Sequence, residues 1–421
     1  MKSIDRITDR AYRLAKSNPQ ARRLMLSALA LSTKGLAFLR SRGNGWREAT
    51  VPVGEASSTK EWVESATQRS GGPLPSYTEV HPRTAQIRYP PKSIYEKTHW
   101  QFEREDRSHS PETFVASIPG GRVLGDGHVI TPDNLVLGDL FRHSGPRTFP
   151  ENPLDNPPFR EKFHPRPMDV DGTVAVLSVP HGRGYYHWML ELLPRIEILR
   201  RAGFELGHID KFIVNTYASW QRETLAALGI SGEDLIQSLW NPHVKARRLL
   251  VPSFPGERFQ VPKWACDFLR STFLDSSSAT ASGPTRIQIS RVQATHRHVE
   301  NQAVIDGYLQ KLGFVRVAME QLSMREKAAL LANAEAVLAP HGSGLVNLVF
   351  CSPGCKVIEL FSPTAIDPLF WRVSCQLQLD YLYVVGQGDT PEEGRHPVGN
   401  VANMAIEPDE LMATMKLAGI S

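Results

Sequence analysis

The sequence has few cysteines and lacks the hydrophobic run that a membrane span or a secretion signal requires. Four cysteines occur in 421 residues, and no second Cys or His pair stands at zinc spacing, so we expect structural thiols. The apolar run 24–39 is too short for a span, is interrupted by Lys34, and has no signal-peptide cleavage site. These absences predict a reducing, cytoplasmic compartment. The cysteines are Cys266, Cys351, Cys355 and Cys375.

The sequence also has little net charge. The net charge of +4 is small for this length, which argues against a nucleic-acid partner. Residues 1–47 carry eleven Lys or Arg against only Asp5 and Asp9. Two interpretations of the segment 1–42 stay open: a basic helix on the inner face of an anionic membrane, or a helix packed on the protein body.

The arrangement of apolar runs and turns predicts the fold. Residues 43–112, rich in Pro, Ser, Gly and charge, predict a linker or a loosely wrapped extension. Turn-forming triplets divide residues 113–137 into short apolar runs, which predicts a β-meander. From residue 173, and again from 286, strands alternate with helices, which is typical of parallel sheets covered by helices. We expect a GT-B-like α/β protein with two Rossmann-type domains facing a cleft, preceded by the meander and a basic N-terminal extension. The predicted ranges are 1–95 for the extension and linker, 96–274 for the first α/β domain and 275–421 for the second.

A glycine-rich loop is the first chemical signal. Residues 341–344 read His-Gly-Ser-Gly between a predicted strand (336–339) and a predicted helix (343–350). The first N–H groups of a helix have no internal partner and lie at its positive end, so this context predicts an anion site. A tight turn with two glycines is the alternative. The loop is neither a Walker loop nor a nucleophile elbow, because it lacks Gly-Lys-[Ser/Thr] and Gly-x-Ser-x-Gly.

Further motifs lie on both sides of this loop. Residues 181–195 contain Tyr-His-Trp followed by Glu-Leu-Leu-Pro-Arg, and Ile-Ser-Arg at 289–291 precedes Arg-His-Val-Glu-Asn at 297–301. Residues 340–347 read Pro-His-Gly-Ser-Gly-Leu-Val-Asn, and 357–359 read Val-Ile-Glu. In order and spacing, these motifs resemble glycosyltransferase family 61 over roughly residues 95–365. Two departures are Gln302, where the family usually has Glu, and Ser343, where it has Ala.

The resemblance implies an inverting, GT-B-type transferase that uses a nucleotide sugar without an obligatory metal or other cofactor. It implies donor binding by the C-terminal domain and acceptor binding by the first α/β domain, in surface or capsular polysaccharide assembly. A UDP-sugar is the favoured donor, and a saccharide or lipid-linked glycan is the acceptor. Two alternatives stay open: a GT-B-like pyruvyl transferase acting on polysaccharide, and a catalytically degenerate relative that binds glycan or scaffolds an assembly.

Donor binding is assigned to two arginines, one carboxylate and the loop. We expect the Arg291 and Arg297 guanidinium groups to clamp a diphosphate, although surface ion pairs are the alternative for both. We expect Glu359, at the end of the strand 356–360, to bond ribose hydroxyls, with a helix cap or a salt bridge as the alternative. The other residues assigned to the donor are Asn301, His341, Gly342, Ser343, Gly344 and Asn347.

Inverting transfer also needs a base that removes the proton of the acceptor hydroxyl. His187 and Glu191 are four residues apart in a predicted helix over 185–202 and therefore share one face. We expect Glu191 to be the base and His187 to be its orienting or alternative partner. The other interpretation is that the aromatic side chains beside His187 pack the helix start and that Glu191 is solvated.

An Asp-x-Asp pair at Asp169 and Asp171 is the remaining candidate, because metal-dependent transferases bind Mn²⁺ or Mg²⁺ at such a pair. Here it follows Pro-Arg-Pro and precedes the strand 173–179, so we expect a turn and no metal site.

Overall fold

The computed structural model of the chain describes residues 51–69, 72–86, 88–103, 109–140, 164, 166–238, 243–257, 260–274, 283–388 and 402–421. The segment 1–42, with its predicted membrane contact, lies outside these residues. The chain divides into unit 1, Met1–Arg83 with Pro111–Phe259, and unit 2, Thr84–Ser110 with Gln260–Ser421. The predicted domain ranges and the predicted cleft stay predictions. Where the chain is described, no helix combines the length and apolar character needed to cross a bilayer.

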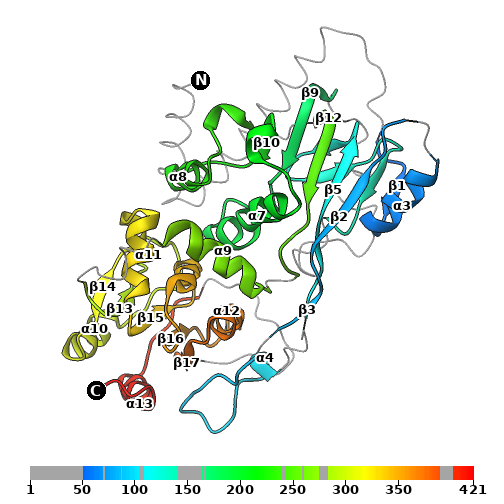
Figure 1. Ribbon diagram of the computed structural model, residues 1–421. Helices are drawn as coiled ribbons and strands as arrows, with labels where there is room; N and C mark the ends of the chain where they lie inside the picture. The colour runs from blue at the N-terminus through cyan, green and yellow to red at the C-terminus, as the bar shows by residue number, and fades with distance from the viewer. Residues whose placement is uncertain are drawn as a thin grey trace. The chain divides into compact units, whose positions relative to one another are not determined.

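Unit 1 is built on a mixed sheet (Figure 1). Its strands are β1 Gly54–Ala56, β2 Ser76–His81, β5 Thr113–Pro119, β6 Arg122–Leu124, β7 His128–Ile130, β8 Leu135–Leu137, β9 Met168–Val176, β10 Lys211–Val214, β11 Leu235–Gln237 and β12 His243–Pro252. Its helical segments are α3 Thr59–Arg69, α6 Tyr185–His187, a π-helical turn Trp188–Leu192, α7 Pro194–Arg201, the 3-10 turns Leu206–His208 and Gly232–Asp234, and α8 Ser219–Ala227.

The long strand β12 joins two kinds of pairing within this sheet. The order β12-β9-β10-β11 is parallel throughout, as the alternation of strands and helices predicts. On its other side β12 pairs antiparallel with β5 and β6, and β6, β7 and β8 form a meander. The predicted strand runs of the meander are therefore present, but β5 pairs with β12 and β2 and not with β6.

The prediction of a linker or a loosely wrapped extension over residues 43–112 is wrong for residues 54–81. β1 pairs in parallel with β8, and β2 pairs antiparallel with β5, so both belong to the sheet. Between them, Trp62 and Val63 of α3 are only 6% exposed and pack in the core of unit 1. Two apolar residues among polar ones do not predict a buried helix, because the strands that bury them are distant in sequence.

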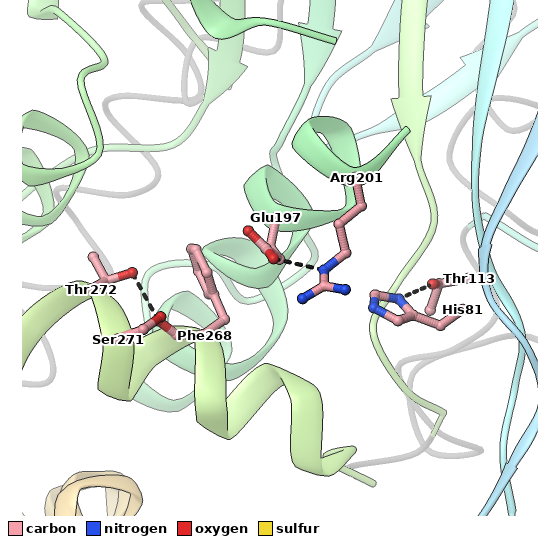
Figure 2. A network of polar contacts seen from close by, with 7 residues as sticks. All are labelled: His81, Thr113, Glu197, Arg201, Phe268, Ser271 and Thr272. Carbon is pink, nitrogen blue, oxygen red and sulfur yellow. Dashed lines mark hydrogen bonds and ion pairs between the residues drawn. The ribbon is translucent and has the colours of Figure 1, made fainter. Parts of the chain in front are cut away.

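Polar side chains of β2, β5 and α7 form hydrogen bonds and an ion pair (Figure 2). The His81 Nδ1 atom lies 2.8 Å from the Thr113 hydroxyl, and Arg201 donates to Glu197 one turn earlier on α7 at 2.7 Å. Burial and the nearby positive charge of Arg201 lower the pKa of His81, against a smaller opposing effect of Glu197. This histidine is therefore held towards its neutral form.

Acid should destabilise unit 1 through His128, a buried residue of β7. Burial, together with the charge of His164, lowers the pKa of His128 from 6.5 to about 3, against the opposing effect of a hydrogen bond with the Leu124 backbone. Because the unfolded chain takes up this proton at a higher pH, the stabilisation is complete above about pH 6.5 and is lost as the pH falls towards 3. Between pH 7 and 5 we expect His128 to account for a loss of about 2 kcal/mol in unfolding free energy.

Urea unfolding of the wild type and of His128→Gln at both pH values measures this loss. Glutamine cannot take up the proton, so its unfolding free energy should fall by about 2 kcal/mol less over the same interval. Equal pH dependence in both proteins would rule out His128 as the acid-sensitive group.

Unit 2 has an all-parallel sheet in the order β14-β13-β15-β16-β17 (Figure 1). Its strands are β3 Thr84–Ala85, β4 His109–Ser110, β13 Arg286–Ile289, β14 Val315–Val317, β15 Ala336–Pro340, β16 Lys356–Phe361 and β17 Asp380–Val385. Its helical segments are α4 Trp100–Glu103, α9 Lys263–Phe273, α10 Gln302–Lys311, the 3-10 turn Met319–Gln321, α11 Met324–Ala332, the 3-10 helix Ser343–Phe350, α12 Leu369–Leu377 and α13 Pro408–Leu417.

The sequence of unit 2 explains its layers. Every residue of β15 is buried, as expected for the central strand of a sheet that helices cover on both faces. α10 and α13 pack on one face, and α9, α11 and α12 contact the Ser343–Phe350 helix. α11 begins with the predicted capping box, in which Ser323 and Glu326 exchange side chain–backbone hydrogen bonds. In α9, Ser271 and Thr272 both donate to the Phe268 carbonyl oxygen (Figure 2).

Candidate active site

The sheet of unit 2 brings two predicted site loops to one point of its carboxyl edge. Arg291 follows β13, and Gly342 follows the adjacent parallel strand β15. Since β14 and β15 lie on opposite sides of β13, the strand order reverses there, which is where open α/β sheets bind ligands.

Arg291 lies directly against Gly342. A Cβ atom at Gly342 would overlap the Nη1 atom of Arg291 and would lie 2.9 Å from its Cζ atom. The φ angle of Gly342 is 165°, which is ordinary extended backbone, so glycine is needed here for space and not for its conformation. We predicted an anion site at this loop, and in the structure the Arg291 guanidinium occupies the space beside Gly342. Nε and Nη2 of Arg291 also donate to the His296 carbonyl oxygen, at 3.3 and 3.0 Å.

A second guanidinium accompanies the first. Arg297 Nη2 lies 3.2 Å from His296 Nε2, and Arg297 Nε is buried without a hydrogen-bond partner. Burial, together with the charge of Arg297, lowers the pKa of Arg291 to about 10, against the opposing charge of Glu320. Burial also lowers the pKa of Arg297, against the opposing charges of Glu359 and Asp367. Among the residues described, neither arginine forms an ion pair with an acidic side chain, so carboxylates oppose the charge of these two desolvated guanidinium groups only from a longer distance.

His341 is held by a buried carboxylate. Its Nδ1 atom lies 2.6 Å from Glu359 Oε1, and the Tyr381 hydroxyl donates to Glu359 Oε2 at 2.5 Å. Burial raises the pKa of Glu359, and the two hydrogen bonds oppose that rise. Because Nδ1 is engaged, Nε2 is the His341 nitrogen available to a ligand.

These contacts favour the salt-bridge alternative for Glu359. The carboxylate was expected at a strand end, bonding ribose hydroxyls, but β16 continues to Phe361 and Glu359 pairs with Ala339 inside the sheet. Its side chain is completely buried, and both oxygens are engaged by protein groups. The geometry therefore gives Glu359 the role of orienting His341. Nothing local in the sequence signalled Tyr381, because its contact is made across the sheet.

The helix after the loop is a 3-10 helix. Its first turn leaves the N–H groups of Ser343 and Gly344 without a partner inside the helix, so they can serve as anion donors. Ser343 is exposed, while Asn347 is buried and donates to the Gly344 carbonyl oxygen at 2.9 Å. The loop therefore offers backbone N–H groups as hydrogen-bond donors, and the Asn347 side chain stabilises the loop conformation.

Asn301, also predicted to bind the donor, is engaged elsewhere. Its amide donates to the Ile406 carbonyl oxygen at 2.7 Å and accepts from the Ile406 N–H at 3.0 Å. This reciprocal pair fastens the chain before α13 to the start of α10. The neighbouring Gln302 donates to Asp306 at 2.6 Å, so it has an internal partner within α10.

In unit 1, His187 and Glu191 are in contact as their spacing predicts. The His187 Nδ1 atom lies 2.8 Å from Glu191 Oε2, and the two side chains are 18% and 12% exposed. The segment between them is a π-helical turn in which Leu193 N–H donates to the Trp188 carbonyl oxygen at 2.9 Å. Single π-helical turns within helices are frequent at functional sites. The pairing is thus present, and the catalytic role of Glu191 stays a prediction.

Arg195 anchors this helical segment and was not singled out from the sequence. The side chain is 2% exposed and donates to the Ser178 carbonyl oxygen at 2.7 Å and to the Pro252 carbonyl oxygen at 3.1 Å. These carbonyls lie at the carboxyl ends of the parallel strands β9 and β12. Burial lowers the pKa of Arg195 to about 9, while the charge of Glu191 acts in the opposite direction. Arg195 therefore holds the helical segment that carries Glu191 over the sheet edge. Its position in the motif at residues 181–195 was the sequence feature that could have identified it.

The Asp-x-Asp pair lies in a strand and not in the predicted turn. Asp169 and Asp171 belong to β9, where Asp169 pairs with Lys245 of β12. Both side chains are exposed, and Asp171 forms an ion pair with Arg247 at 3.3 Å. The turn was wrong because pairing with β12 extends the strand towards its N-terminus. In the described chain, no cluster of three His, Cys, Asp or Glu residues is arranged to hold a metal ion.

Comparison with known proteins identified a family match that includes parts of both units. The Glycosyltransferase 61 family model matches residues 185–358. A comparison with curated proteins found no match. The matched region contains the His187–Glu191 pair, Arg291, Arg297 and the loop at Gly342, and ends one residue before Glu359. By this match, residues 185–358 form a glycosyltransferase family 61 region, the family that the sequence motifs resemble.

Proposed function

We propose that this glycosyltransferase is inverting and moves a sugar from a nucleotide sugar, with a UDP-sugar favoured, to a saccharide acceptor. The observation that carries the proposal is the desolvated guanidinium of Arg291, which lies against the loop at Gly342, together with the neighbouring desolvated guanidinium of Arg297. A diphosphate supplies the negative charge that these groups lack, and guanidinium groups bind phosphate oxygens in a bidentate manner.

Donor activation follows from the same contacts. As the bond between the anomeric carbon and the diphosphate breaks, negative charge grows on the leaving phosphate oxygens. Arg291 and Arg297 stabilise that charge from a partly desolvated position, where electrostatic interactions are stronger than in water. The N–H groups of Ser343 and Gly344, and His341 through Nε2, supply further donors.

Acceptor activation is assigned to unit 1. The acceptor hydroxyl oxygen attacks the anomeric carbon from the face opposite the leaving group while Glu191 takes its proton. His187 bonds to Glu191 and fixes the carboxylate on one side, and Arg195 holds the helix. His187 as the base, with Glu191 orienting it, is the alternative assignment of the same pair.

The wider setting is also a proposal. The family match and the basic composition of residues 1–42 support action on a saccharide or lipid-linked glycan in surface or capsular polysaccharide assembly. We place the enzyme in the cytoplasm, peripheral to the inner face of the membrane.

A thermal-shift panel of UDP-, GDP-, CMP- and dTDP-sugars tests the donor assignment. A ligand at about 100 times its Kd adds about 2.7 kcal/mol to the unfolding free energy, so the cognate nucleotide sugar should raise the melting temperature by several degrees. No shift with any of the four classes would refute the proposal.

Gly342→Ala should weaken donor binding while leaving the fold intact. The backbone at this position accepts alanine, but the added methyl group displaces the Arg291 guanidinium. We expect nucleotide affinity to fall by about tenfold or more, since at least one charge-assisted bond is lost. Gly307→Ala in α10, where a Cβ atom meets open space, is the matched control and should bind as the wild type does.

Turnover should survive chelation. In the proposal the arginines supply the positive charge at the diphosphate, so EDTA should leave the initial rate unchanged. The double variant Asp169→Asn, Asp171→Asn should likewise keep wild-type turnover, because both side chains are exposed on β9. A rate that falls with EDTA and returns with Mg²⁺ or Mn²⁺ would reverse this assignment.

A further inference from the structure

The chain before β5 contributes a segment to unit 2 that lies outside the matched family region. β17 is the edge strand of the unit 2 sheet, and Lys92 forms a parallel bridge to it at Leu382. Lys92 N–H donates to the Tyr381 carbonyl oxygen at 3.0 Å, and the Lys92 carbonyl oxygen accepts from Tyr383 N–H at 3.3 Å. The segment therefore extends the sheet, with an ion pair between Lys92 and Asp380 at 2.6 Å.

Ten residues further on, Phe102 of α4 enters a cluster of aromatic rings. The side chain is 4% exposed, and its ring centroid lies 4.7 Å from that of Tyr383 and 5.6 Å from that of Trp371. Tyr381 and Phe361 are the next neighbours, at 6.2 and 6.4 Å. These distances are those of aromatic pairs that add stability beyond the area they bury.

Two of these neighbours lead directly to His341. The Phe361 ring stacks on the His341 imidazole, with centroids 5.3 Å apart and an angle of 26° between the planes. Tyr381 donates to Glu359, which in turn bonds to His341 Nδ1. Phe102 thus contacts both the ring that lies on the histidine and the tyrosine that fixes its carboxylate partner.

We propose that Phe102 is a positioning residue for His341. In this proposal residues 88–103, which come between the two sequence parts of unit 1, stabilise the donor site of unit 2. The proposal rests on the proposed function, in which His341 contacts donor phosphate. Without the Phe102 ring, Phe361 and Tyr381 lose an aromatic packing partner. The His341 imidazole can then rotate away from the orientation in which Nε2 points at the ligand. Groups that act on a substrate lose effectiveness when their supporting contacts are loosened.

The test compares full-length Phe102→Ala and Phe102→Leu with Lys92→Ala. Lys92→Ala is the control, because it removes the ion pair to Asp380 in the same segment and leaves the aromatic cluster intact. Two quantities are measured: the Kd of UDP, and the nitrogen-bound Hδ1 resonance of His341 in ¹⁵N-histidine-labelled protein, assigned with His341→Asn. We expect Phe102→Ala to bind UDP about tenfold more weakly and to shift or broaden the Hδ1 resonance. Phe102→Leu keeps the apolar volume, so it should fold and show a smaller change in both quantities.

The outcomes separate the two proposals. An unchanged His341 resonance in both Phe102 variants, or an equal change in Lys92→Ala, overturns the positioning role whatever UDP does. If the wild type fails to bind UDP while Phe102→Ala still alters the resonance, UDP binding in the proposed function fails and the positioning of His341 stands. Weaker UDP binding by the Phe102 variants alone, together with the altered resonance, supports both.

Discussion

Arg291→Ala should abolish measurable binding of the nucleotide donor. The side chain lies against Gly342 at the switch point of the sheet, and a guanidinium can form two charge-assisted bonds to a diphosphate. Each such bond contributes about 1.5–3 kcal/mol, so losing two weakens binding by a factor of roughly 100 or more. Calorimetric titration with the nucleotide that stabilises the wild type measures the change. Arg291→Lys should recover only part of the affinity, because an ammonium group keeps the charge and loses the planar fork.

Arg316→Ala is the matched control for this variant. Arg316 belongs to the same unit and pairs with Asp306 at 2.9 Å, but its side chain is 37% exposed, and such pairs contribute little. We expect wild-type affinity in this control. Undiminished affinity in a folded Arg291→Ala protein would contradict the assignment of Arg291 to the diphosphate.

Glu191→Gln should lose turnover by about 10²- to 10⁴-fold while donor affinity stays unchanged. Glutamine keeps the length of the side chain and can still accept the bond from His187 Nδ1, so the imidazole keeps its orientation. What the variant loses is the carboxylate that takes the proton. Initial rates of sugar transfer, set beside donor titrations, separate this loss from a loss of binding.

Glu197→Gln is the control on the following helix. Glu197 pairs with the half-exposed Arg201 on α7, so turnover should be retained. Normal turnover in Glu191→Gln combined with a large loss in His187→Gln would move the role of the base to His187. Normal turnover in both variants would remove the pair from catalysis.

Unit 2 was predictable from the sequence where its signals are local. β15 is a short, continuously apolar run, β16 is mostly apolar, and Ser323 with Glu326 marks the start of α11, so these elements lie close to where the pattern places them. The pairing of His187 with Glu191 followed from helical spacing alone. The family resemblance was predicted over roughly residues 95–365, and the family model matches residues 185–358 within that range.

The remainder depends on contacts between residues distant in sequence. The strand character of Asp169 comes from pairing with Lys245, and α3 is fixed by burial of Trp62 against strands that follow it. Glu359 was recognised as a motif residue, yet its role depends on Tyr381, which becomes its neighbour only through sheet pairing. Phe102 gave no signal at all, because a lone aromatic in a polar segment is ordinary until its partners are known.

Hydrogen exchange on the intact protein tests the central claim most directly. Adding the nucleotide sugar that stabilises the protein should slow exchange of the amides in residues 342–347, because the account places the donor phosphates on the N–H groups of Ser343 and Gly344. Peptides covering Arg291 and Arg297 should be protected in the same experiment. Protection that leaves residues 342–347 unchanged and appears only in unit 1 would contradict the account.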